Sequence, residues 1–256
     1  STFLQRGYDG IVHDVALQDL PVVFGMDRAG VAGADGPTHH GTFDINYMLS
    51  IPGMTVTAPK DGSEMLALLR AGVNHDEGPF SIRWPRDSVP EAVPHISEIP
   101  EVPYASWEIL RRGEDVAVLA VGTMVLEAMK AAAILSAEGI EITVVNCRFM
   151  KPYDARALDE ILAGHPKLLT VEEGAVVNGF GAFLAGELSR IPEAAGVQIR
   201  TLGIPDRFIA HGGRAKLLRE IDLDAQGIAE WVREMTGLGA TEAPERIPRP
   251  SPQETA

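Results

Sequence analysis

A predicted strand runs directly into a glycine-rich loop in VVFGMDRAGVAGADGPTHHG, residues 22–41. Residues 22–26 follow a proline and form the short apolar run that is typical of a buried strand. The next fifteen residues hold four glycines, two histidines, an arginine and two aspartates. Ligands of open α/β sheets bind beyond the carboxyl ends of the strands, and glycines let backbone approach a ligand closely. We therefore expect a functional site in the loop 27–41.

Short apolar runs alternate with helical patterns on both sides of this loop. The alternation predicts an α/β protein with two domains, each with a mostly parallel sheet flanked by helices. The predicted strands are residues 22–26, 55–57, 80–83, 116–121, 142–147, 168–171 and 199–202. The predicted helices are residues 3–15, 61–74, 126–137, 155–162, 179–191 and 228–235.

Proline-rich segments divide the chain. Prolines at this density prevent regular helices and central strands, and they occur at positions 90, 94, 100 and 103 and again near the C-terminus. We expect a first domain over residues 1–88, a linker over 89–106 and a second domain over 107–238. Residues 239–256 are polar and rich in proline, which predicts a disordered tail.

Composition narrows the class of protein. The net charge of −14 repels nucleic-acid phosphates at long range, so nucleic acid is not an expected partner. Cys147 is the only cysteine and lies in an apolar run, which predicts a buried core residue. Apolar runs are too short to span a bilayer, and residues 1–10 do not form a signal peptide. A cytoplasmic protein without a membrane partner is the expectation.

Several segments resemble one enzyme family. DRAGVAGADGPTHHG (27–41) and FDINYMLSIPGMTVTAPKD (43–61) look like the pyrimidine-binding domain of the 1-deoxy-D-xylulose-5-phosphate synthases, and so do STFLQRGYDGIVHDVALQDLPVVF (1–24) and GPFSIRWPRD (78–87). GEDVAVLAVGTMVLEAMKAA (113–132) and TVEEGAVVNGFGAFLAGEL (170–188) are similar to a transketolase C-terminal domain. The resemblance covers residues 1–238 and implies a transketolase-like fold.

The resemblance implies a transferase that joins pyruvate to D-glyceraldehyde 3-phosphate with loss of CO₂. Its product would serve isoprenoid, thiamine and pyridoxal phosphate synthesis. The implied cofactors are thiamine diphosphate and Mg²⁺, and the implied assembly is a homodimer. The alternatives are a transketolase, a β-type chain of a 2-oxoacid dehydrogenase, or a module without catalytic activity.

Six residues are candidates for the site. Arg28 and Arg86 can hold a phosphate bidentately, and the resemblance assigns them to the substrate phosphate. The resemblance makes His39 a catalytic group beside the pyruvate-derived adduct, and a histidine can move protons near neutral pH. It gives Asp35 a role in catalysis and in binding substrate hydroxyls. It also places Phe3 on the cofactor pyrimidine, with Arg6 nearby. Surface ion pairs, turn residues and core packing are the ordinary alternatives for these types of residue.

Other motifs are not assigned a chemical role. His40, the pair Glu172 and Glu173, and the segments 206–208 and 211–213 are interpreted as structural, packing or interface residues. The family holds Mg²⁺ and diphosphate on an N-terminal domain through a Gly-Asp-Gly motif, and a glutamate activates the cofactor ring. This sequence contains neither that motif nor a match to that glutamate, so no metal ligand is expected here. We expect the chain to require the N-terminal part of the same enzyme and to be inactive alone.

Overall fold

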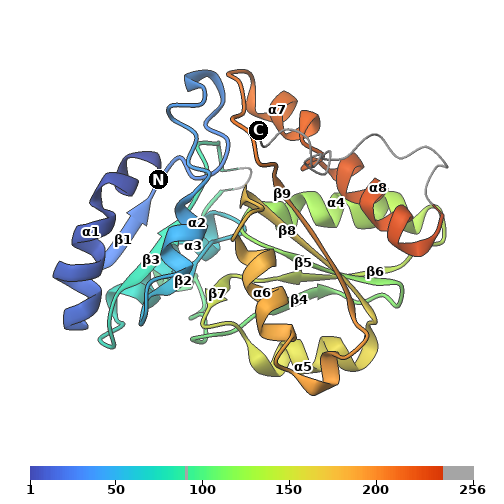
Figure 1. Cartoon of the computed structure of the whole chain (residues 1–256), viewed down its shortest axis with the longest axis horizontal. Helices are drawn as coiled ribbons and strands as arrows, with labels where there is room; N and C mark the ends of the chain where they lie inside the picture. The colour runs from blue at the N-terminus through green and yellow to red at the C-terminus, as the bar shows by residue number, and fades with distance from the viewer. Residues whose placement is uncertain (90–91, 239–256) are drawn as a thin grey trace, which may run out of the picture.

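The computed structural model describes residues 1–89 and 92–238, which form two sheets flanked by helices (Figure 1). Both sheets are mostly parallel, so the predicted fold class is confirmed. The predicted tail, residues 239–256, lies outside the described residues. None of the described helices is long and apolar enough to cross a membrane.

The first sheet contains the three strands expected before the linker and one that was not expected. Its order is β1 (Val23–Met26), β3 (Phe80–Arg83), β2 (Thr55–Thr57) and β7 (Phe149–Lys151). β1 and β2 both run parallel to β3. β7 comes from the second half of the chain and pairs antiparallel with β2. The sheet therefore draws strands from both sides of the predicted linker.

The second sheet has the order β4 (Glu108–Arg111), β6 (Ile142–Asn146), β5 (Val116–Ala120), β8 (Lys167–Ala175) and β9 (Gln198–Ile204). Every residue of β5 and β6 is buried, as their continuous apolar sequences predict. The antiparallel strand β4 was not predicted, because its sequence EILR has too little alternation to stand out.

Helices cover both sheets, and side chains fix where several of them begin. Asp61, Asp154 and Asp224 each accept a hydrogen bond from the backbone N–H three residues later, which caps the helix that follows. Two helices, α2 and α7, were not predicted. The α-helices are α1 (Tyr8–Gly10) within a helical segment over residues 2–18, α2 (Asp44–Leu49), α3 (Gly62–Val73), α4 (Met124–Ser136), α5 (Ala155–Gly164), α6 (Phe180–Leu188), α7 (Arg214–Glu220) and α8 (Ala225–Thr236).

Two apolar clusters form the main core. One lies between the second sheet and the helices α4 and α8, and it includes Val118, Ala128 and Val232. The other lies on the opposite face of this sheet, which α5 and α6 cover (Figure 1), and it also includes residues of the first sheet. Met26 and Ile45 of the first half belong to the same cluster as Leu119, Val145 and Phe180 of the second. Cys147 is fully buried in this cluster, as predicted, and burial raises the pKa of its thiol.

The proline-rich segment between β3 and β4 is held against the first sheet. Its described residues contain one short 3₁₀ turn, Ile96–Glu98, and no strand or α-helix. Arg70 of α3 donates hydrogen bonds to the carbonyl oxygens of Ile96 and Ile99. Ile99 is buried. The segment is therefore an ordered connection along much of its length.

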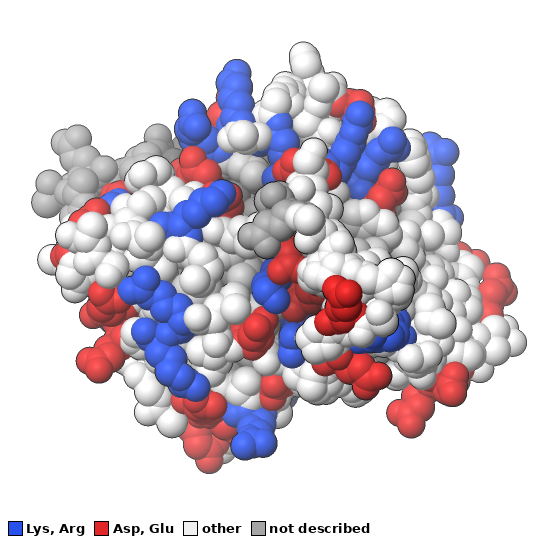
Figure 2. All heavy atoms as spheres, turned by 180° about the vertical axis from the view of Figure 1, so that it is seen from behind, with Lys and Arg blue, Asp and Glu red and all other residues white. Residues whose placement is uncertain are grey.

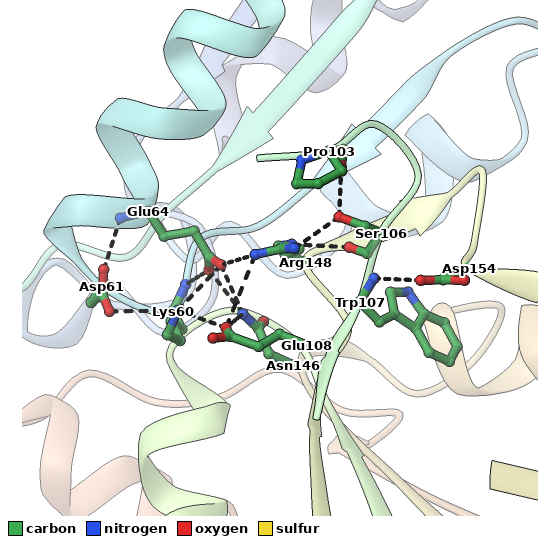
Figure 3. A network of polar contacts seen from close by, with 10 residues as sticks. All are labelled: Lys60, Asp61, Glu64, Pro103, Ser106, Trp107, Glu108, Asn146, Arg148 and Asp154. Atoms are coloured by element: carbon green, nitrogen blue, oxygen red, sulfur yellow. Dashed lines mark hydrogen bonds and ion pairs between the residues drawn. The ribbon is translucent and has the colours of Figure 1, made fainter. Parts of the chain in front are cut away.

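A polar network also joins the two sheets (Figure 3). Glu64 of α3 is buried and accepts hydrogen bonds from Asn146 and Arg148 of the second half. Lys60 Nζ lies 2.9 Å from Glu108 Oε2 and 3.3 Å from Glu64 Oε1. Burial alone lowers the pKa of Lys60, but these carboxylates outweigh it and raise the pKa. The network and the shared core fix the position of one sheet against the other.

Because the core is shared, we expect the two halves to unfold in one transition. Leu119→Ala removes a fully buried side chain from the shared cluster and should lower the free energy of unfolding by about 2–5 kcal/mol. Leu17→Ala, at a side chain that is 74% exposed, should change it by less than about 0.5 kcal/mol. Urea denaturation followed by fluorescence and circular dichroism measures both. Two separated transitions, with Leu119→Ala affecting only one, would contradict the shared core.

Candidate functional site

The loop over residues 27–41 is closed at its base by backbone hydrogen bonds. Gly30 N–H donates to Gly41 O over 2.6 Å, and Gly41 N–H donates to Gly30 O over 2.8 Å. Gly30 has a φ of +75°, and a Cβ there would lie 2.4 Å from Glu173. A Cβ on Gly41 would lie 2.5 Å from Arg28 O. Both glycines are therefore required by the space around them, and the loop has one defined path.

Arg28 and Arg86 line the same cleft, which has a volume of about 680 Å³. The cleft lies beyond the carboxyl ends of β1, β2 and β3 and beside the start of α4, where an α/β protein is expected to bind a ligand. Both halves of the chain contribute to its walls, and three other basic side chains also line it: Lys60, Lys130 and Arg214. Figure 2 shows Lys and Arg side chains interspersed with Asp and Glu side chains on one face of the molecule. A net charge of −14 therefore does not prevent several basic side chains from lying close together.

The two arginines differ in their partners. Arg86 Nη1 lies 2.5 Å from Asp35 Oδ2, and the two side chains are 54% and 34% exposed. Arg28 has a left-handed backbone with a φ of +53° and forms no ion pair with any described residue. An ion pair this exposed holds its partners weakly, so an incoming anion can compete for Arg86. Of these two guanidinium groups, one has no ion pair among the described residues and the other is in an exposed ion pair.

His39 and Phe3 contact each other, and neither lines this cleft. Their rings meet edge to face with the centroids 5.5 Å apart. His39 Nδ1 lies 2.9 Å from Thr38 Oγ1, and Phe3 is 59% exposed. Asp35 connects the pair of His39 and Phe3 to the cleft. It lies on the loop that carries His39, and it forms the ion pair with Arg86. Arg6 is exposed on the helical segment 2–18, and its side chain has no hydrogen bond to a described residue.

His40 supports the loop through hydrogen bonds, and its interpretation as a structural residue stays a prediction. Its side chain is buried, and its Nδ1 accepts a hydrogen bond of 2.9 Å from Ala32 N–H. Nδ1 therefore carries no proton, and Nε2 donates to Ala210 O over 3.2 Å. Gly212 N–H also donates to Gly33 O. The segment over residues 210–213 thus packs against the loop that carries the candidate site.

Buried charged side chains support the loop, and the sequence alone did not indicate this role. Arg83 Nε lies 3.0 Å from Asp44 Oδ2, with both side chains almost fully buried, and Arg83 Nη2 donates to Glu173 O. Glu173 Oε1 accepts a hydrogen bond from Val31 N–H, and Arg214 Nη2 lies 2.5 Å from Glu173 Oε2. These residues are far apart in sequence, so spacing gave no signal. The only sequence signal for this group of residues was the pair Glu172 and Glu173 directly after a predicted strand.

Glu172 has a different role from its neighbour. Its two carboxylate oxygens accept hydrogen bonds from Phe180 N–H and Gly181 N–H at the start of α6. Burial raises the pKa of this carboxyl from 4.5 to about 7, against the opposing effects of those N–H groups and of Arg83. The glutamate therefore caps a helix from inside the core and makes no hydrogen bond to the loop 27–41.

A second cavity of about 470 Å³ is lined by His40 and residues around it. Its walls include Phe43, Val177 and Phe208, and their side chains are 45%, 50% and 82% exposed. The segment 206–208 belongs to this surface, while His211 packs against Gly36. No group of three or more His, Cys, Asp or Glu side chains among residues 1–89 and 92–238 could hold a metal ion.

Two family models match the chain. The model of the transketolase pyrimidine-binding domain matches residues 1–91, and that of the transketolase C-terminal domain matches residues 105–228. The chain is 44% identical over 246 residues to the 1-deoxy-D-xylulose-5-phosphate synthase of Gloeobacter violaceus, which covers 95% of this chain and 38% of the relative. It is 46% identical over 229 residues to 1-deoxy-D-xylulose-5-phosphate synthase 1 of Geobacter sulfurreducens, covering 90% of this chain and 36% of the relative. The chain thus spans well under half the length of these relatives.

Solved structures show the same fold. A split-gene transketolase, described as an inactive β4 tetramer, has a TM-score of 0.80 and 27% identity, covering 93% of this chain and 74% of that one. A transketolase mutant from Pichia stipitis has a TM-score of 0.71 at 20% identity, covering 92% of this chain and 33% of that one.

The raised pKa of Glu172 predicts a pH-dependent stability. Between pH 4.5 and 7 the folded state keeps a proton that the unfolded state loses, so stability falls as the pH rises through this window. The fall should amount to at most about 3 kcal/mol. Glu172→Gln cannot titrate and should show a flatter pH dependence. Urea unfolding of both proteins at pH 5 and pH 8 measures the difference, and equal changes in both would refute it.

The exposed pair of Arg86 and Asp35 yields a second prediction. Asp35→Asn removes the carboxylate that competes for Arg86, so inorganic phosphate should bind the chain about two- to fivefold more tightly at low ionic strength. Asp9 does not line the cleft, and Asp9→Asn makes the same change in net charge. It should therefore have little effect on phosphate binding. Phosphate titrations followed by amide chemical shifts compare the two. Unchanged or weaker binding by Asp35→Asn would contradict the competition.

Proposed function

The chain belongs to the transketolase family and is homologous to the C-terminal part of the 1-deoxy-D-xylulose-5-phosphate synthases, and we propose that it is part of such an enzyme. The complete enzyme would be a thiamine-diphosphate-dependent transferase that joins pyruvate to D-glyceraldehyde 3-phosphate with loss of CO₂. Its product would supply isoprenoid, thiamine and pyridoxal phosphate synthesis. The observation that carries the proposal is the cleft shared by Arg28 and Arg86 at the carboxyl ends of the strands.

In this proposal Arg28 and Arg86 hold the phosphate of the triose. A triose phosphate carries close to two negative charges, which two guanidinium groups match, and the planar fork of each guanidinium can donate to two phosphate oxygens. Arg28 has no ion pair to break among the described residues. Arg86 exchanges an exposed ion pair with Asp35 for the substrate, which involves a small loss of stability because solvent screens that pair.

We assign His39 the role of hydrogen bonding and proton transfer at the carbon atoms that react. A histidine can exchange protons near neutral pH, and His39 Nε2 has no hydrogen bond to a described residue. Once the phosphate displaces Asp35 from Arg86, the Asp35 carboxylate is free to accept a hydrogen bond from a substrate hydroxyl. His39 and Asp35 both lie on the loop 27–41. The same loop would therefore position groups for substrate binding and for proton transfer.

The residues present fit part of the cofactor. Phe3 is exposed and uses one edge contact on His39, so the aromatic ring is available to stack on an aminopyrimidine. We propose that Arg6, exposed on the same helical segment, lies near that ring. Thiamine diphosphate, when bound, supplies the electron sink for the decarboxylation of pyruvate. We assign Mg²⁺ and the diphosphate group to the N-terminal part of the enzyme, which is also the proposed partner of this chain.

The alternatives fit less well. A transketolase or a β-type chain of a 2-oxoacid dehydrogenase would share the fold, but the relatives at 44–46% identity carry the synthase name. A module without activity does not account for the cleft that Arg28 and Arg86 both line. The cytoplasmic location and the homodimer are parts of the same proposal and rest on the resemblance to this family.

Arg86→Ala tests the phosphate role. In an enzyme assembled from this chain and the N-terminal part of a relative, the variant should raise KM for D-glyceraldehyde 3-phosphate about 10- to 100-fold, because a charged hydrogen-bond donor is lost. KM for pyruvate should change by less than about twofold. Steady-state kinetics with each substrate varied in turn measures both.

Arg112→Ala is the matched control for this experiment. Arg112 forms a surface ion pair with Glu160 and does not line the cleft. Its replacement should leave both KM values unchanged. Equal losses for the two substrates in Arg86→Ala would remove the arginine from the phosphate site, and turnover with sugar-phosphate donors in place of pyruvate would favour a transketolase.

A further inference from the structure

Glu173 connects the second sheet to the candidate site. It lies near the end of β8, and its side chain is only 3% exposed. One carboxylate oxygen accepts a hydrogen bond of 2.8 Å from Val31 N–H, inside the loop 27–41. This contact joins residues that are 142 positions apart in the chain. The loop is therefore anchored by a charged acceptor from the other half of the molecule.

Arg214 extends the connection to the segment that carries Arg86. Its Nη2 lies 2.5 Å from Glu173 Oε2, and its Nη1 lies 3.0 Å from Asp87 Oδ2. Asp87 is the residue next to Arg86. Arg214 lines the cleft together with Arg28 and Arg86, and its side chain is 17% exposed. One guanidinium thus holds both a buried carboxylate behind the loop and the segment after β3.

The surroundings of Glu173 allow little movement. Arg83 Nη2 donates to the Glu173 carbonyl oxygen over 2.8 Å, and Arg83 also pairs with the buried Asp44. The carboxylate sits directly against Gly30, where a Cβ would come within 2.4 Å of it. A buried carboxylate that accepts from a backbone N–H and pairs with a guanidinium has a defined position. It therefore sets the position of Val31, three residues beyond Arg28.

We propose that Glu173 and Arg214 are positioning residues that set the distance between Arg28 and Arg86. Glu173 fixes the loop that carries Arg28, and Arg214 fixes the segment that carries Arg86, while the pair ties the two together. The second half of the chain then contributes to anion binding through the placement of Arg28 and Arg86. The inference deepens the proposed function and rests on it for the identity of the anion.

Glu173→Gln tests this arrangement, with Glu172→Gln as the matched control. Both variants remove one buried carboxylate from β8, but Glu172 bonds to α6 and makes no hydrogen bond to the loop. Inorganic phosphate is titrated into each chain, and binding is followed by amide chemical shifts. Glu173→Gln should bind phosphate about tenfold more weakly, because a misplaced guanidinium loses its alignment. Glu172→Gln should bind like the unaltered chain.

A local measurement separates positioning from general stability. The Val31 amide proton should shift upfield in Glu173→Gln, and the Gly41 amide should exchange faster with solvent, while neither changes in Glu172→Gln. Equal phosphate affinity in Glu173→Gln and the unaltered chain overturns the proposal. Failure of the unaltered chain to bind phosphate counts against the proposed function instead, and the Val31 and Gly41 amides then decide whether Glu173 positions the loop.

Arg214 variants keep the test decisive if Glu173→Gln does not fold. Arg214→Met removes both ion pairs at the cleft wall and should weaken phosphate binding about tenfold. Arg214→Lys keeps a charge for Glu173 but cannot reach Asp87 at the same time, so it should restore part of the affinity. Phosphate affinity that is the same in Arg214→Met, Arg214→Lys and the unaltered chain would refute the role of the pair.

Discussion

A carboxylate that is shut off from water must find its hydrogen-bond donors within the protein, and Glu173 finds them in both halves of this chain. Val31 N–H reaches it from the loop 27–41, and Arg214 reaches it from α7. The donors are available only when the two sheets are packed in one relative position. The path of the loop, and with it the placement of Arg28, therefore depends on contacts that the loop itself does not contain.

Rigid support and exposed chemistry are separated in this molecule. Asp44, Arg83 and Glu173 are buried and paired, whereas Arg86 and Phe3 are largely exposed. Buried pairs hold their geometry because a broken partner leaves an uncompensated charge, while exposed pairs exchange partners readily. The shared apolar cluster and the network around Glu64 add to the support from behind. The groups assigned to ligands are thus exposed, while the residues that support them are buried and paired.

Much of the fold could be predicted, because its signals are local. The continuous apolar runs of β5 and β6 and the aspartate at the start of α3 predicted their elements to within two residues. The four elements that were not predicted, β4, β7, α2 and α7, are short and depend on contacts with distant parts of the chain. For example, α2 has six residues and β7 has three. The loop 27–41 could be proposed as a site from its residue types and its position after a strand, whereas Arg86 was proposed from its resemblance to a family motif. Arg214 could not be proposed, because only the folded chain brings it to Glu173 across 41 residues.

The antiparallel strand β7 has a consequence for dissecting this protein. It follows β6 of the second sheet after two residues, yet it completes the first sheet by covering the free side of β2. A cut in the proline-rich segment would look like a clean separation of two modules, but it would strip β2 of its neighbour and bare a row of backbone donors and acceptors. Exposed strand borders of this kind recruit other chains and lead to aggregation. The two halves are therefore better regarded as a single folding unit whose boundary in sequence differs from its boundary in space.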